Sequence, residues 1–181
     1  MENNLPGRKG TRLGEFDYSK HGAYFITICT EGRKHILSEI VCDIDTAGEL
    51  NPNESVGEGS PLPQLSAFGK IVDRWINTIP EKYPNISVDR YVIMPDHIHL
   101  LLFVENIGRG DPSPTISTVV GWFKFHSTKD INAVSNASGR KIFQRSFYDH
   151  IIRNQHDYDE VAKYIYENPM RWKFDKLYGS E

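Results

Sequence analysis

Short stretches rich in apolar, β-branched and aromatic residues predict four extended segments, residues 23–30, 86–93, 97–104 and 143–152. Residues 23–30 are bracketed by Gly22 and Gly32, which favours a buried strand. Residues 97–104 form a nearly continuous apolar run, as expected for a central strand that is covered on at least one face. The turn residues 94–96 stand between this run and the segment before it, so the two segments are predicted to form a hairpin.

Apolar residues at three- and four-residue spacing predict three amphipathic helices. The first begins at Ser66, whose hydroxyl can cap it, and ends at one of the prolines that follow. The second covers residues 115–131. The third covers residues 156–168 and is expected to end at Asn168-Pro169, because a residue before proline disfavours the helical conformation.

The order of these elements is strand, helix, hairpin of two strands, helix, strand, helix. It predicts an α+β fold with an antiparallel sheet and helices packed on one face. A ferredoxin-like arrangement fits this order. The strand at residues 97–104 would then be central.

The chain of 181 residues is short enough for one domain. Residues 1–20 are polar and basic and are interpreted as an N-terminal arm. Residues 21–175 are predicted to form the single domain. Within it, residues 43–64 are acidic and rich in Gly and Pro, which predicts an exposed loop insertion. Residues 176–181 form a tail.

Charge and composition exclude several classes of protein. The formal net charge of −3 excludes a globally basic nucleic-acid binder but not a protein with a basic patch. No apolar run is long enough to span a membrane, and no secretory signal is recognisable. The two cysteines, Cys29 and Cys42, make neither a disulfide scaffold nor a four-ligand zinc site. We therefore expect a cytoplasmic protein.

The sharpest chemical feature is His97-Ile98-His99. In a strand, side chains two residues apart point to the same face, so two imidazole rings would lie side by side and could bind one divalent cation. The preceding turn would place the pair where a site can face solvent. The spacing alone leaves the alternative that both histidines are satisfied by hydrogen bonds within the strand.

Tyr164 and Asn168 are four residues apart and share one face of the third helix. A phenol can attack phosphorus if a metal neutralises the phosphate, and the nearby amide oxygen could be a third metal ligand. Tyr166 points elsewhere. The alternative interpretation of Tyr164 is a half-buried core tyrosine.

Basic residues interleaved with aromatic ones occur in the second half of the chain, a composition that suits a phosphate backbone with stacked, unpaired bases. The basic residues are Lys124, Arg140, Lys141, Arg145, Arg153, Arg171 and Lys173. The alternative is an ordinary solvated surface. Arg145 and Arg153 are our candidates for phosphate contacts, together with Arg8, Lys9 and Arg12 of the N-terminal arm.

Four blocks of the chain resemble, in order, those of the IS200-like transposases, the HUH tyrosine family, and most closely the branch associated with repetitive extragenic palindromes. The blocks are residues 16–30, 91–99, 144–154 and 164–169. The resemblance implies a ferredoxin-like core, His97, His99 and Asn168 as ligands of Mg²⁺ or Mn²⁺, and Tyr164 as the nucleophile.

The resemblance also implies an activity. Such an enzyme cleaves and rejoins single-stranded DNA near hairpins through a 5′-phosphotyrosine, and it would be associated with the nucleoid when bound to DNA. Relatives include monomers and homodimers, so the oligomeric state stays open. Two other functions are considered, a metal-dependent phosphoesterase and a non-catalytic derivative that binds hairpin DNA. A histidine-triad hydrolase would need a third alternating histidine, and position 101 is Leu101.

Overall fold

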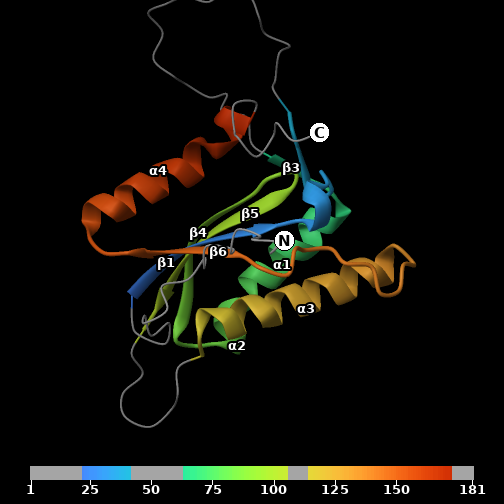
Figure 1. The fold of residues 1–181 in the computed structure, drawn as a ribbon, viewed down its shortest axis with the longest axis horizontal. Helices are drawn as coiled ribbons and strands as arrows, with labels where there is room; N and C mark the ends of the chain where they lie inside the picture. The colour runs from blue at the N-terminus through green and yellow to red at the C-terminus, as the bar shows by residue number, and fades with distance from the viewer. Residues whose placement is uncertain (1–21, 42–62, 106–113, 173–181) are drawn as a thin grey trace, which may run out of the picture.

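The computed structural model describes residues 22–41, 63–105 and 114–172, and its centre is a four-stranded antiparallel sheet (Figure 1). The strands are β1 (Gly22–Cys29), β4 (Ile86–Ile93), β5 (His97–Val104) and β6 (Tyr148–Ile152). They are arranged in the order β4-β5-β1-β6, and each pairs antiparallel with its neighbour. This is the strand order of a ferredoxin-like fold. The α+β prediction and the central position of the histidine strand are confirmed.

The remaining elements are four α-helices, a short 3-10 helix and a small second sheet within the described residues. The helices are α1 (Ala67–Asn77), α2 (Ile79–Lys82), α3 (Ile116–Val134), α4 (Gln155–Arg171) and the 3-10 helix η1 (Glu31–Arg33). The second sheet pairs β2 (Ser38–Ile40) with β3 (Pro63–Leu65). The predicted acidic loop therefore ends in a strand, while its residues 43–62 lie outside the described part of the chain, as do the arm and the tail.

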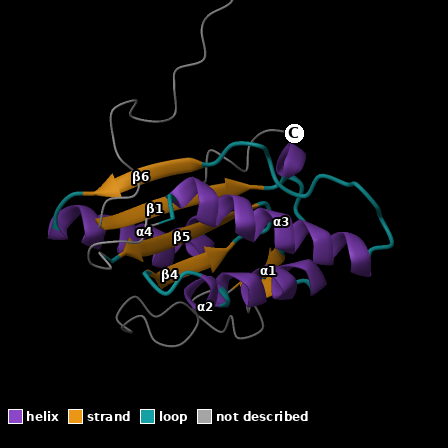
Figure 2. Ribbon diagram, turned by 90° about the horizontal axis from the view of Figure 1, so that it is seen from below, coloured by secondary structure: helices purple, strands orange, loops and turns teal. Residues whose placement is uncertain are grey.

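Helices cover both faces of the sheet, not one as predicted. Side chains alternate along β1, so that Tyr24, Ile26 and Ile28 pack into a core with residues of α1 and α3. Phe25 points the other way and packs with Ile165 of α4 in a second core. Figure 1 shows α4 on one side of the strands and α1 and α3 on the other, and Figure 2 shows the sheet from the side of α1 and α3. The strands are apolar on both faces, so burying both requires a second helical layer.

The sequence predicted the starts of the helices more accurately than their ends. Ser66 caps α1 by accepting a hydrogen bond from the backbone N–H of Gly69 at 3.1 Å, as predicted. However, α1 ends at Asn77, before the prolines. The prediction that Asn168-Pro169 ends the last helix is wrong, because α4 continues through Pro169 to Arg171. Both residues are buried, so packing against the sheet outweighs the hydrogen bond that proline cannot donate.

Among the described residues, no helix combines the length and the apolar character needed to cross a membrane.

Candidate active site

The two histidines of the predicted metal pair lie on β5 at the centre of the sheet. His97 is paired with Cys29 of β1 and His99 with Thr27. Their ring centroids are 4.5 Å apart, as expected for side chains on the same face of a strand. The exposed fractions of the two residues are 0% and 2%. The expectation that the pair faces solvent is therefore wrong, because the end of α4 packs over it.

Each imidazole is fixed through one ring nitrogen, and the other nitrogen has no partner. Nδ1 of His97 lies 2.6 Å from a carboxylate oxygen of Asp96, and Nδ1 of His99 lies 2.9 Å from the hydroxyl of Thr27. A carboxylate can only accept, so Asp96 keeps a proton on Nδ1 of His97. Both Nε2 atoms are buried without a hydrogen-bond partner among the described residues. Metal-binding histidines are commonly oriented in this way.

An ion pair with Arg33 holds the Asp96 carboxylate that contacts His97. Nε of Arg33 lies 2.8 Å from the second carboxylate oxygen of Asp96, whose side chain is fully buried. The same guanidinium donates to the sulfur of Cys29 at 2.7 Å. Gly32 and Arg33 both have positive φ, 65° and 54°, in the tight turn that brings the guanidinium back to β1. Sequence analysis identified neither Arg33 nor Asp96, and the one available signal was that an acidic residue precedes the histidine pair.

One face of α4 lies over the histidines. The ring of Tyr164 is 5.1 Å from that of His99, and the ring of Trp172 is 5.8 Å from that of His97. Asn168 is one helical turn from each of these aromatic residues and therefore lies between them on the same face. It is 2% exposed. Its side-chain oxygen is buried and has no hydrogen-bond partner among the described residues.

These residues fit a divalent cation. Buried polar atoms are almost always hydrogen-bonded, yet among the described residues three acceptors on these elements have no partner. They are the Nε2 atoms of His97 and His99 on β5 and the amide oxygen of Asn168, on the helix whose Tyr164 lies against His99. Two imidazoles and one amide oxygen form a mixed nitrogen and oxygen donor set of the kind that binds divalent cations. Within the described ranges, no three His, Cys, Asp or Glu residues gather to hold a metal.

The surroundings of His99 disfavour a charge on its ring. Burial lowers the pKa of His99 well below its usual value of 6.5, and the nearby His97 and the Arg33 guanidinium lower it further. His99 is therefore neutral at pH 7, and a cation would not have to displace a proton from it.

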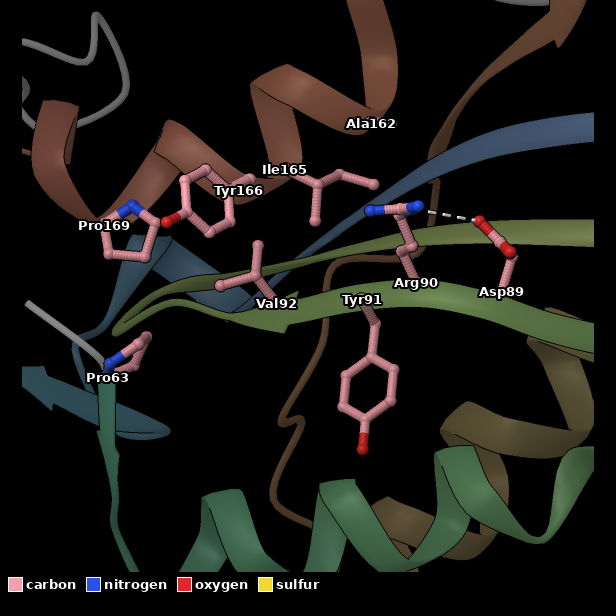
Figure 3. Close-up of a pocket in the computed structure, with 9 residues that line it drawn as sticks. All are labelled: Pro63, Asp89, Arg90, Tyr91, Val92, Ala162, Ile165, Tyr166 and Pro169. Carbon is pink, nitrogen blue, oxygen red and sulfur yellow. Dashed lines mark hydrogen bonds and ion pairs between the residues drawn. The ribbon is translucent and has the colours of Figure 1, made fainter. Parts of the chain in front are cut away.

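Tyr166 belongs to a different environment. It is 68% exposed and lines a cleft of about 370 Å³ between α4 and the outer strand β4. Figure 3 shows its ring beside Pro169, with Ile165 and Val92 also at the cleft. The helix thus places Tyr164 toward the histidines and Tyr166 toward this cleft, as the helical spacing predicted.

The predicted DNA contacts are only partly described. Arg145 and Arg153 are both exposed. Arg145 lies in the segment before β6, and Arg153 lies between β6 and α4. Arg8, Lys9 and Arg12 lie outside the described residues.

Comparisons with known proteins identify the family of this chain. A solved structure of a REP-associated tyrosine transposase bound to a REP hairpin has a similar fold, with a TM-score of 0.54 and 18% sequence identity over 91% of this chain and 76% of that one. An uncharacterized protein of Haemophilus influenzae is 29% identical over 187 residues, which cover 94% of this chain and 93% of the relative. Residues 68–168, more than half of the chain, match the family described as "Transposase IS200 like". The chain therefore belongs to the IS200-like transposase family.

Proposed function

We propose that the protein is a metal-dependent transposase that cleaves and rejoins single-stranded DNA near hairpins through a phosphotyrosine. The observation that carries the proposal is that three buried acceptors on β5 and α4 lack a hydrogen-bond partner among the described residues, while the ring of Tyr164 on α4 lies against that of His99. The fold likeness to a transposase that binds a REP hairpin supports hairpin DNA as the substrate.

In this proposal His97, His99 and Asn168 hold Mg²⁺ or Mn²⁺. When bound, such a cation neutralises charge on the scissile phosphate and so lets a weak nucleophile attack it. The protein's own part is to fix the donors. Asp96 and Thr27 hold the two rings, and α4 carries Asn168.

Tyr164 is the proposed nucleophile. Its phenol oxygen loses its proton and forms a bond to phosphorus while the bond from phosphorus to the 3′ oxygen breaks. The departing 3′ oxygen takes up a proton, so that no proton is gained or lost overall. The products are a 5′-phosphotyrosine and a free 3′-hydroxyl. A second 3′-hydroxyl can attack the phosphotyrosine, restore a phosphodiester and return the tyrosine, so that rejoining needs no nucleotide cofactor. Asn168 and Tyr164 share one helix, so the ligand and the nucleophile are placed by a single rigid element.

The test is a denaturing gel of the protein incubated with a single-stranded hairpin oligonucleotide and Mn²⁺. We expect a covalent protein–DNA band that is lost with a chelator and in Tyr164→Phe and retained in Tyr166→Phe, the matched control on the other side of α4. Free cleaved DNA without the covalent band would instead mean an ordinary phosphodiesterase. Binding on native gels without any cleavage would mean a non-catalytic hairpin-binding derivative.

A further inference from the structure

A segment that belongs to none of the four main strands extends the sheet at its histidine end. The backbone N–H of Gln144 donates to the carbonyl of Cys29 at 2.9 Å, and the N–H of Glu31 donates to the carbonyl of Ile142 at 2.8 Å. Cys29 is in turn paired with His97. His97, Cys29 and Gln144 therefore lie on three neighbouring extended segments. At the ordinary strand spacing, Gln144 is about 10 Å from His97 along the sheet.

This segment and α3 enclose a basic groove of about 320 Å³. Its cationic lining residues are Lys124, Arg140, Lys141 and Arg145. None of the described residues that line it is acidic. Lys141 and Arg145 are exposed, and neither is paired with a carboxylate in the described part of the chain. Since the whole chain has a net charge of −3, this concentration of positive charge is local.

The groove is held in shape by one of its own cations. The ammonium of Lys124 donates to the backbone carbonyls of Gln144 and Ser146, at 2.9 Å in each case, and it lies 5.6 Å from the ring centroid of Phe147. Lys124 thus fastens the segment to α3 and keeps a positive charge at the groove. Arg140 packs over the ring of Phe68 at 5.5 Å. Two cations are therefore fixed by packing, while Lys141 and Arg145 remain available to a ligand.

We propose that the basic groove binds the sugar–phosphate backbone of the DNA strand that enters the active site. This inference rests on the proposed function and adds the path of the substrate. The distance of about 10 Å separates the backbones of Gln144 and His97 within the sheet, whereas the groove lies on the face covered by α3 and the histidines point to the face covered by α4. The strand would therefore pass around the end of the sheet, and the groove would hold phosphates more than about three nucleotides from the scissile one, since a stacked strand rises ~3.4 Å per nucleotide. Because the contacts are charge to phosphate, they fix position and carry no base preference.

The test measures affinity, not cleavage. Fluorescence anisotropy follows binding of a hairpin oligonucleotide with a single-stranded extension to the full chain in EDTA, over a range of salt concentrations. In Lys141→Gln and Arg145→Gln we expect weaker binding, and a slope of log affinity against log salt that is shallower by about 0.7–1 for each charge removed. In the double variant the slope should be shallower by the sum of the two single reductions. Both side chains are exposed, so the melting temperature should stay unchanged.

Lys82→Gln is the matched control. Lys82 is exposed on α2, which leads into the end of β4 that is paired with Val104, at the opposite end of β5 from His97. We expect its affinity and salt slope to match those of the wild type. A salt slope in the double variant equal to that of the wild type, or an equal loss in Lys82→Gln, would overturn the proposal.

A second readout separates this proposal from the proposed function. With Mn²⁺ present, covalent complex is measured in the wild type and in the double variant over a range of DNA concentrations, and the double variant should need more DNA than the wild type to reach half of its maximal yield. If the wild type forms no covalent complex but the salt slopes differ as expected, the cleavage proposal fails and the groove proposal stands. A double variant that binds normally but loses the covalent band would contradict the groove proposal alone.

Discussion

Asp96 and His97 are adjacent in sequence, are both fully buried, and are joined by a 2.6 Å contact between the carboxylate and Nδ1 of the ring. Arg33 contacts the other oxygen of the same carboxylate. Asp96 thus links the half-buried guanidinium of Arg33 to the first proposed metal ligand and fixes the orientation of its ring. A buried carboxylate is costly unless it is paired, and here one oxygen contacts Nδ1 of His97 and the other forms an ion pair with Arg33.

Replacing Asp96 with Asn should weaken metal binding. The amide would no longer require the proton on Nδ1 of His97 and would make the ring a poorer ligand. We expect Mn²⁺ affinity to fall about 10–100-fold, as measured by calorimetry or by the electron paramagnetic resonance signal of free Mn²⁺. Asp89→Asn is the matched control, since Asp89 is a surface carboxylate that pairs with Arg90 on β4. Unchanged Mn²⁺ affinity in Asp96→Asn would contradict the proposed role of the ion pair.

Replacing Asn168 with Asp should make the protein's stability depend more strongly on metal. Without metal, a carboxylate at this 2% exposed position lacks a partner and should lower the melting temperature. With Mn²⁺ the added charge should tighten binding, so the increase in melting temperature on adding Mn²⁺ should exceed that of the wild type. Differential scanning fluorimetry with and without metal measures both effects. A smaller increase than in the wild type would argue against Asn168 as a ligand.

The stability of the metal-free protein should fall below pH 6.5. The folded-state pKa of His99 is lowered by burial first and by His97 and Arg33 second, so the unfolded chain binds more protons than the folded chain. The contribution of His99 is then fully present above the unfolded value of 6.5 and is lost as the pH falls toward the folded-state pKa. Chemical denaturation in EDTA between pH 8 and pH 5 measures this.

His99→Gln supplies the comparison for that titration, because it removes this one group and leaves the other histidines. The difference in the free energy of unfolding between wild type and variant should shrink as the pH falls below 6.5. A difference that stays constant with pH would mean that His99 does not titrate as its burial requires.

Two helical glycines should respond to alanine in opposite ways. A Cβ at Gly69 of α1 would lie 2.0 Å from the carbonyl oxygen of Leu37, a clash with backbone that cannot move aside easily. A Cβ at Gly121 of α3 would meet no atom within 4 Å. Gly69→Ala should therefore be strongly destabilised, while Gly121→Ala should be stabilised by roughly 0.5–1 kcal/mol because alanine favours the helix. Urea denaturation distinguishes the two, and equal effects would mean that α1 does not pack this closely.

The sequence predicted most of the fold because the hydrophobic pattern of each segment matches the strand or helix that the segment forms. The apolar runs gave the strands, the three- and four-residue spacing gave the helices, and Ser66 marked the start of α1. The prediction failed where packing opposed a local preference. Pro169 favours ending a helix, but its buried position in α4 outweighs this. Because the strands are apolar on both faces, the sequence did not show which face each helix would cover. Among the described α-helices, α4 is the one that lies on the side of His97 and His99.

The sequence by itself identified the candidate ligands and nucleophile. The two-residue period of a strand puts His97 and His99 on one face, and the helical period puts Tyr164 and Asn168 on one face. What only the tertiary structure decided is that these two pairs face each other, and that Arg33, 63 residues before Asp96 in the chain, completes their support. Contacts between residues so far apart leave no periodic trace in the sequence. They arise when the strands pair in a specific register and the helices pack on a specific face.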